Sequence, residues 1–484
     1  MFKPRPYQQK IIDECRTALS RGFLSPLVQA PTGSGKTIIF AWIVKQVTEN
    51  KKRALVLTHR REILEQTIKK FYGFGITCGQ IASRAPMTHD LAQVAMIGTL
   101  INRLEQVQKP DIIIIDEGHH SAASMWERVL NYFYDVPRIG FSATPERLDG
   151  QGLGDLFDIM IHGPSVKYLV ENGFLSEPHI FSSELALGIN YHVTRGDYDL
   201  QEQTETMSRR IIVGDAIDHK RQYLPNLPTI TFCPSIKHCQ TMEDSFNDAG
   251  IKTMTIHGKL KDQQREDMIK ALGDGTIENI CSCEVISEGV DIPIVAGAIM
   301  MRKTMSLSLY LQQAGRALRT YPGKKAAVIL DQCGNVFRHG HVMNDRKWSL
   351  NQEKKKAKQE KAPEITRCPR CMLVLAGKPA KCTACGYVFP KVSERARADR
   401  IEQVEGELRK VMPENMTDAD GSRTLAEFID SLNNLPPEKR HYAAWVKANE
   451  LGDKAKIKRL GEMMGYHKNW INEIWPSVAR NVGV

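Results

Sequence analysis

Short apolar runs alternate with amphipathic stretches from the start of the chain to about residue 160. The apolar runs have the length of buried strands, and they lie at Leu27–Gln29, Ala54–Leu57, Val94–Ile97, Ile112–Ile115 and Ile139–Ser142. Helical patterns such as Thr37–Val47 and Arg61–Tyr72 separate several of them. Because strands that alternate with helices are typical of a parallel sheet covered on both faces, this region is predicted to be an α/β domain.

The same alternation returns from about residue 165 to residue 345 and then stops. Its predicted strands are Thr229–Phe232, Thr253–Ile256, Ile280–Ser282, Ala298–Met301 and Ala326–Leu330. Next come a basic stretch, a patch with paired cysteines and a long stretch rich in helix formers. We therefore predict five regions: α/β domains over 1–164 and 165–345, a linker over 346–365, a cysteine-paired patch over 366–390 and a helical region over 391–484.

Composition points to a multidomain protein of a reducing cytoplasm. A chain of 484 residues is too long for one compact core and suggests roughly two to four domains. It has no uncharged apolar stretch of about 18 residues, and its start, MFKPRPYQQK, has no apolar signal region, so we expect neither a membrane span nor secretion. Seven of the 11 cysteines are scattered and four form two close pairs, as expected for free thiols and one metal site.

Positive charge is concentrated in one segment. The chain carries a net charge of +10, and residues 346–391 hold twelve Lys or Arg against three Asp or Glu. This segment includes the lysine run Glu353–Lys361, which has no apolar core pattern. A solvated linker and a contact with nucleic acid both explain such a run.

The sequence APTGSGKT, Ala30–Thr37, follows an apolar strand and precedes a helical pattern, which is the context of a nucleotide phosphate loop. Its glycines let backbone N–H groups surround phosphate oxygens at a helix N-terminus. In such a loop Lys36 reaches the β- and γ-phosphates and Thr37 offers a hydroxyl to Mg²⁺. Ala30 replaces the usual first glycine, so an ordinary glycine-rich turn is the alternative. The loop residues predicted to bind nucleotide are Thr32, Gly33, Ser34, Gly35, Lys36 and Thr37.

An acidic pair, Asp116 and Glu117, follows four consecutive isoleucines that predict a central strand. The carboxyl end of such a strand is where α/β proteins bind ligands. We expect Asp116 to bind Mg²⁺ through water and Glu117 to be the general base for the attacking water. The alternative is that the pair caps the next helix.

These motifs resemble those of the superfamily 2 helicases. APTGSGKT and DEGH are similar to motifs I and II, and Ser142–Thr144 is similar to motif III, with the extension TPERLDG resembling RadD-type proteins, UvrB and restriction-enzyme motor subunits. Arg5–Gln8 (RPYQ) resembles an adenine-recognition motif, although it also fits an ordinary helix start. Thr58–Leu64, Gly98–Thr99, Ser287–Pro293 and Gln312–Arg319 resemble four further motifs, so the resemblance covers residues 5–319.

The resemblance implies two tandem RecA-like domains with ATP between them. It implies that Arg5, Tyr7 and Gln8 contact the base, that Gly289 and Asp291 contact the nucleotide, and that Gln312, Arg316 and Arg319 act in hydrolysis. Arg316 and Arg319 lie three apart on a predicted helix, so both project from one face, and planar guanidinium groups suit a transferring phosphoryl group. Surface arginines on a solvated helix are the alternative. Nucleic-acid contact or coupling is implied for Thr58, Arg60, Thr99, Ser142, Thr144 and Ser287.

Two CxxC pairs, Cys368/Cys371 and Cys382/Cys385, are separated by ten residues. Two such pairs can complete a closed tetrahedral site, which predicts a structural zinc ribbon without catalytic function. A redox dithiol and an iron–sulfur site are the alternatives. Zinc would then fold a patch with little core of its own.

The sequence therefore predicts an ATP-dependent DNA helicase or translocase of repair, recombination or replication, using ATP, Mg²⁺ and Zn²⁺. The alternatives are an ATP-driven factor that remodels proteins on DNA and an RNA helicase. DNA, single-stranded or branched, is the expected partner, with a protein partner as an option for the zinc ribbon or the C-terminal region. The expected location is the bacterial cytoplasm, or the host cytoplasm if a phage encodes the chain.

Overall fold

The computed structural model describes residues 3–118, 124–146, 152–182, 191–194, 196–286, 294–351, 365–368, 370–371 and 373–389. The chain divides into two units, Met1–Phe389 and Pro390–Val484. All described residues belong to the first unit, so the predicted helical region over 391–484 lies outside them. In the described part of the chain, every helix is too short or too polar to cross a membrane.

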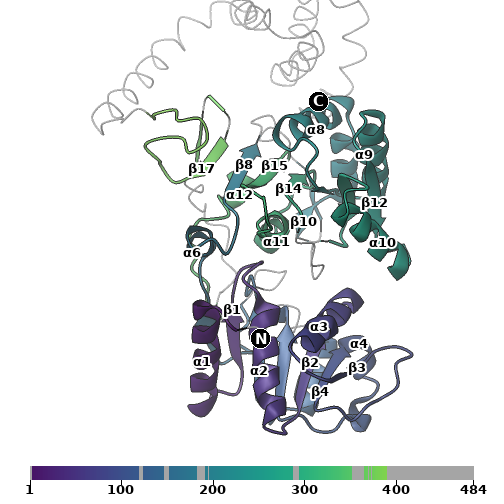
Figure 1. The fold of residues 1–484 in the computed structure, drawn as a ribbon, viewed down its shortest axis with the longest axis vertical. Helices are drawn as coiled ribbons and strands as arrows, with labels where there is room; N and C mark the ends of the chain where they lie inside the picture. Colours follow the sequence, from purple (N-terminus) through teal and green to yellow (C-terminus); the bar gives the residue numbers. More distant parts are fainter. Residues whose placement is uncertain are drawn as a thin grey trace, which may run out of the picture. The chain divides into compact units, whose positions relative to one another are not determined.

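The first domain, called lobe one here, is a seven-stranded parallel sheet in the order β3-β4-β2-β5-β6-β1-β7. Its strands are β1 (Pro26–Gln29), β2 (Ala54–Thr58), β3 (Cys78–Ile81), β4 (Ala92–Met96), β5 (Ile112–Asp116), β6 (Arg138–Ser142) and β7 (Ile159–His162). Its helices are α1 (Pro6–Ser20), α2 (Lys36–Glu49), α3 (Arg61–Gly73), α4 (Ile97–Leu100), the 3₁₀ helix η1 (Leu104–Gln106) and α5 (Ser124–Tyr132). Figure 1 shows these elements in purple and blue.

The second domain, lobe two, is built on a sheet in the order β12-β13-β11-β14-β15-β8-β17-β16. The strands are β8 (Pro178–Ser182), β11 (Thr229–Phe232), β12 (Thr253–His257), β13 (Asn279–Cys283), β14 (Gly297–Met300), β15 (Ala327–Asp331), β16 (Ile365–Arg367) and β17 (Leu373–Ala376). The helices are α6 (Val166–Glu171), α7 (Leu200–Met207), α8 (Arg210–Tyr223), α9 (Ile236–Asp248), α10 (Asp262–Gly273), α11 (Leu307–Ala317) and α12 (Asn335–His339), and a small hairpin is formed by β9 (Val193–Thr194) and β10 (Asp197–Tyr198).

The sheet of lobe two continues into the cysteine-paired patch. Strands β12 to β8 are parallel, whereas β17 pairs antiparallel with β8, and β16 pairs antiparallel with β17. Phe181 of β8 packs on the small apolar core of the patch, beside Leu373 and Tyr387. The patch is therefore joined to lobe two through backbone pairing.

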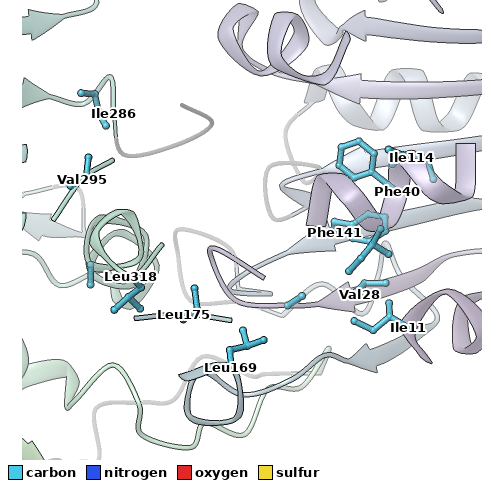
Figure 2. Packing of buried hydrophobic residues seen from close by; sticks show 14 of the residues in the cluster. Ile11, Val28, Phe40, Ile114, Phe141, Leu169, Leu175, Ile286, Val295 and Leu318 are labelled. Carbon is cyan, nitrogen blue, oxygen red and sulfur yellow. The ribbon is translucent and has the colours of Figure 1, made fainter. Parts of the chain in front are cut away.

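The cores explain why the sequence pattern was informative. All residues of β1, β2, β5 and β11 are buried, as expected for central strands of a parallel sheet with both faces covered. One apolar cluster contains residues of both lobes, and Figure 2 shows members of it from Ile11 and Phe40 to Leu175 and Leu318. The α/β class with two RecA-like parallel-sheet domains is confirmed.

Candidate functional site

The phosphate loop joins β1 to α2 and has a backbone that requires glycine at two positions. Gly33 and Gly35 have φ of +85° and +79°, a region that other residues adopt at a cost. A Cβ on Gly33 would lie 2.7 Å from Leu175 Cδ2, and a Cβ on Gly35 would lie 2.7 Å from Gln8 Nε2. Gly35 is also the N-cap of α2, so Lys36 begins the helix. The loop thus presents its N–H groups at a helix N-terminus, where an anion is stabilised.

The acidic pair lies opposite the lysine of this loop. Asp116 ends β5 and is 8% exposed. Glu117 follows with φ of +53°, an uncommon conformation for a non-glycine residue, and its N–H donates to Asp116 Oδ1 at 3.1 Å. Lys36 Nζ is 3.4 Å from Glu117 Oε1, and both side chains are largely buried. The pair is therefore held at the mouth of the phosphate loop.

Lobe two contributes α11 to the same place. Gly315 lies so close to the phosphate loop that a Cβ there would be 2.6 Å from Thr32 Cβ. Gln312 and Arg316 are 3% and 4% exposed, and the Gln312 Nε2 amide has no hydrogen-bond partner among the described residues. The helix ends at Ala317, so Arg319 follows the helix and does not lie on it as predicted. Leu318 keeps right-handed helical angles, which is why Arg319 still faces the same cavity as Arg316.

A cavity of about 350 Å³ lies among these segments. It is lined by most residues predicted to bind or hydrolyse the nucleotide: Arg5, Gln8, Thr32, Gly33, Gly35, Lys36, Thr37, Asp116, Glu117, Gln312, Arg316 and Arg319. The sequence analysis missed other lining residues, among them Lys3, Lys70 and Phe174. These three lie outside the recognised motifs, and only the tertiary structure brings them to the cavity.

Tyr7 and Ser34 are next to the cavity but are not among its lining residues. The Tyr7 hydroxyl donates to Ser34 O at 2.7 Å, and burial raises the pKa of Tyr7. Gln8 Nε2 donates to the same carbonyl at 3.2 Å, and Gln8 Oε1 accepts from the N–H of Arg5 at 2.9 Å. The first turn of α1 thus supports the phosphate loop through the carbonyl of Ser34.

Lys324 binds backbone carbonyls at the end of α11, a role that the sequence did not predict. Its Nζ donates to Ala317 O, to Arg319 O at 2.7 Å and to Val295 O at 2.8 Å. Three carbonyl acceptors use all three N–H groups of an ammonium. Burial, with the Arg319 guanidinium nearby, lowers the pKa of Lys324 to about 7. The lysine therefore ties the backbone that carries Arg319 to the preceding strand region of lobe two.

The residues predicted for nucleic-acid contact or coupling fall into two groups. Thr58, Thr99 and Ser142 lie within lobe one, whereas Arg60 and Thr144 contact lobe two. Thr58 Oγ1 donates to Ala95 O at 3.3 Å, and Thr99 lies half-buried on α4. Arg60 Nη1 donates to Glu284 O of lobe two at 3.2 Å. Thr144 Oγ1 lies 2.6 Å from Ser308 Oγ of α11, and Ser142 Oγ donates to Thr144 O at 2.9 Å. Arg60 and Thr144 therefore connect the lobes directly.

Three predicted residues, Ser287, Gly289 and Asp291, lie outside the described residues. A further contact between the lobes joins Arg265 of α10 to Glu62 of α3, at 2.6 Å between Nη2 and Oε1. Because α3 also lines the cavity, this ion pair connects the cavity wall to lobe two.

The four paired cysteines converge on one point. Their Sγ atoms all lie within 4.8 Å of one another, with Cys368–Cys385 at 3.5 Å and Cys371–Cys382 at 3.6 Å. Tetrahedral zinc with Zn–S bonds of about 2.3 Å would hold its sulfur atoms about 3.8 Å apart. The geometry and the all-thiolate donor set therefore fit zinc.

Two protein families match this chain. The family described as "Type III restriction enzyme, res subunit" matches residues 1–147, and the "Helicase conserved C-terminal domain" family matches residues 215–321. The first match covers the phosphate loop and the acidic pair. The second contains α11.

Two curated relatives and one solved structure extend the comparison. The chain is 31% identical to a 51.5 kDa protein of Lactococcus phage (isolate 7-9) over 379 residues, 78% of this chain and 80% of the phage protein. It is 30% identical over 355 residues to a Saccharomyces cerevisiae protein whose name assigns it as an ATP-dependent helicase, IRC3, covering 68% of this chain but only 51% of the yeast protein. A solved ATP-dependent Type ISP restriction-modification enzyme, LlaBIII bound to DNA, has a similar fold over 68% of this chain and 27% of that one, with a TM-score of 0.50 and 16% identity.

Proposed function

The chain belongs to the superfamily 2 helicases, ATP-dependent enzymes that act on nucleic acid, and we propose that it is a DNA-directed translocase or helicase of repair, recombination or replication. Within the family it is assigned to the RadD-type branch, which its TPERLDG extension and its cysteine ribbon resemble. Domain boundaries are assigned at 164, 345, 365 and 390.

The observation that carries the proposal is a nucleotide cavity with walls from both lobes. Lys36 and the loop N–H groups bind the phosphates, while Thr37 and Asp116 would hold Mg²⁺, which would offset the charge of the phosphate oxygens. Glu117 accepts the proton of the attacking water. Arg316 and Arg319 stabilise the charge that develops on the transferring phosphoryl group.

Hydrolysis is coupled to lobe movement because the two halves of this site are on different domains. Arg316 and Arg319 belong to lobe two, whereas Lys36 and Glu117 belong to lobe one. The contacts of Thr144 with Ser308 and of Arg60 with the Glu284 carbonyl also join the two lobes. Opening the lobes separates the arginines from the phosphates, so each cycle of ATP alternates two lobe positions.

DNA is assigned to the edge that carries Arg60 and Thr99, with Ser287 of lobe two as a further contact. Such residues hold a phosphate backbone and carry no sequence information. Thr58 is fully buried and bonded to Ala95 O, so it supports this edge from within lobe one. The DEGH form of motif II and the DNA-bound LlaBIII structure both favour DNA over RNA.

The test is the ATPase rate of the full chain with single-stranded DNA, duplex DNA, forked DNA and RNA, measured in parallel. We expect DNA to stimulate turnover and RNA to have little effect. Stimulation by RNA alone would replace the DNA assignment with an RNA helicase. Stimulation by DNA without strand separation would instead indicate a factor that remodels proteins on DNA.

A further inference from the structure

Phe174 is an aromatic side chain of the nucleotide cavity that no helicase motif accounts for. It lies in the connector between α6 and β8, outside both family matches, and lines the cavity together with Arg5 and Lys3. The Arg5 guanidinium carbon is 4.5 Å from the centre of the Phe174 ring, so a planar cation is stacked on a planar ring at the cavity wall.

The aromatic residue that the sequence offered for this role is committed elsewhere. Tyr7 is 7% exposed, its hydroxyl is bonded to Ser34 O, and its ring packs 5.2 Å behind Phe174 at an angle of 56°. The Gln8 amide is bonded to the phosphate loop and to the Arg5 N–H. Among the described cavity residues, Phe174 and Arg5 are the flat groups on this wall.

The two residues after Phe174 connect this wall to the rest of the site. Leu175 Cδ2 lies 2.7 Å from the position that a Cβ on Gly33 would take, so Leu175 packs directly on the phosphate loop. The Ser176 N–H donates to Leu318 O at 2.8 Å, next to Arg319. Figure 2 shows Leu169, Leu175 and Leu318 in this region. The connector between α6 and β8 thus contributes Phe174 to the cavity wall and also contacts the phosphate loop and the segment that carries Arg319.

We propose that Phe174, with Arg5 stacked on its ring, is the nucleobase platform of this site. The inference rests on the proposed function, in which the cavity binds ATP. A nucleobase has a π-face that stacks on a guanidinium plane or an aromatic ring, and such a platform supports binding without reading the edge of the base. The phosphates are bound by other residues, so the platform contributes to ATP affinity and leaves triphosphate affinity unchanged.

The test compares ATP with inorganic tripolyphosphate, which has the phosphates but no base. Titration calorimetry with Mg²⁺ on the full chain gives both affinities for the wild type, Phe174→Leu and Phe174→Tyr. Leucine keeps apolar bulk against Tyr7 but has no ring face. Base–aromatic stacking corresponds to about 5- to 150-fold in affinity. We expect Phe174→Leu to lose that factor for ATP and nothing for tripolyphosphate, and Phe174→Tyr to bind both ligands as the wild type does.

Tyr168 supplies the matched control. It is an aromatic residue of α6, 42% exposed, which packs edge-on against Tyr7 and does not line the cavity. Tyr168→Leu should leave both affinities unchanged. Equal losses of ATP and tripolyphosphate affinity in Phe174→Leu would mean that Phe174 only shapes the phosphate loop, and no loss of either would also overturn the platform. If the wild type bound neither ATP nor tripolyphosphate, the proposed function itself would fail.

Discussion

The nucleotide cavity and the cysteine cluster are assembled in opposite ways. The cavity takes residues from Lys3 to Thr320 and from both lobes, whereas the cluster takes its four thiols from residues 368–385. The walls of the cavity pack on one large apolar core that contains residues of both lobes. The cluster has a small apolar core of its own, in which Leu373, Leu375, Cys368 and Cys382 are buried.

This difference predicts different responses to damage. The cavity is embedded in two folded domains, so a single polar substitution should remove chemistry while the fold survives. The cluster has little buried apolar surface of its own, so if zinc links its four thiols, removing a ligand should unfold the patch and leave the chemistry largely intact. The predictions below test this contrast, from the largest expected effect on ATP turnover to the smallest.

Arg316→Ala should give the largest loss. An arginine that stabilises the transferring phosphoryl group contributes about 10³- to 10⁵-fold in rate, so stimulated turnover should fall by that order, and Arg319→Ala should also reduce it strongly. Arg316→Lys should recover little because a point charge lacks the planar fork. The measurement is kcat with saturating ATP and DNA, with circular dichroism to check the fold. Full recovery by lysine at both positions would argue against contact with the transition state.

Glu117→Gln should bind ATP and fail to turn it over. The amide can touch the attacking water but cannot accept its proton, and general-base catalysis is worth about 10²- to 10⁴-fold. Single-turnover hydrolysis and equilibrium ATP binding, measured on the same preparation, separate the two effects. A collapse of ATP affinity would instead assign Glu117 a structural role through its contact with Lys36.

Replacing Cys382 and Cys385 together with Ser should release zinc, unfold the patch and change basal ATPase activity by no more than about twofold. The wild type should contain one zinc per chain by metal analysis, and the variant none. Because β17 pairs with β8, some destabilisation of lobe two is expected, visible as a lower unfolding temperature. Retention of metal by the variant would point to a different ligand set.

The sequence predicted the strands that alternate with helices better than the contacts between segments far apart in the chain. All ten predicted strands are present, because long apolar runs between helices have few other solutions in an α/β fold. It missed β3 and β8, whose apolar residues are interrupted by polar ones, as well as β7 and the strands β9, β10, β16 and β17. The pairing of β17 with β8 was also missed, since a backbone contact between distant segments leaves no periodic signal.

The candidate site shows the same division. Most of the glycines, acids and arginines that the motifs single out line one cavity, and their roles there stay predictions. Phe174 and Lys324 were not predicted because each acts through a tertiary contact. Phe174 stacks with Arg5, and Lys324 binds the carbonyls around the end of α11. The expectation that Arg319 lies on the helix was wrong because α11 ends at Ala317.

The smallest effect on turnover is expected from the lysine run before the ribbon. Deleting everything after Arg346 would test this region poorly, because it would expose the β8 edge and remove Leu350, which packs on the core of lobe one. Replacing Lys354, Lys355, Lys356 and Lys358 with Ala leaves those contacts in place. The four substitutions should spare basal ATPase activity, weaken DNA binding and make its salt dependence shallower. The slope of log affinity against log salt concentration should fall by about 0.7 to 0.9 for each DNA phosphate that a lysine no longer neutralises.

The measurement is the affinity for single-stranded DNA at several salt concentrations, with the Cys382 and Cys385 variant as the comparison. Its change in slope should be smaller, since the lysines remain. If affinity and slope stay the same in the lysine variant, the run is a solvated linker, and the ribbon is better explained as a binding surface for a protein.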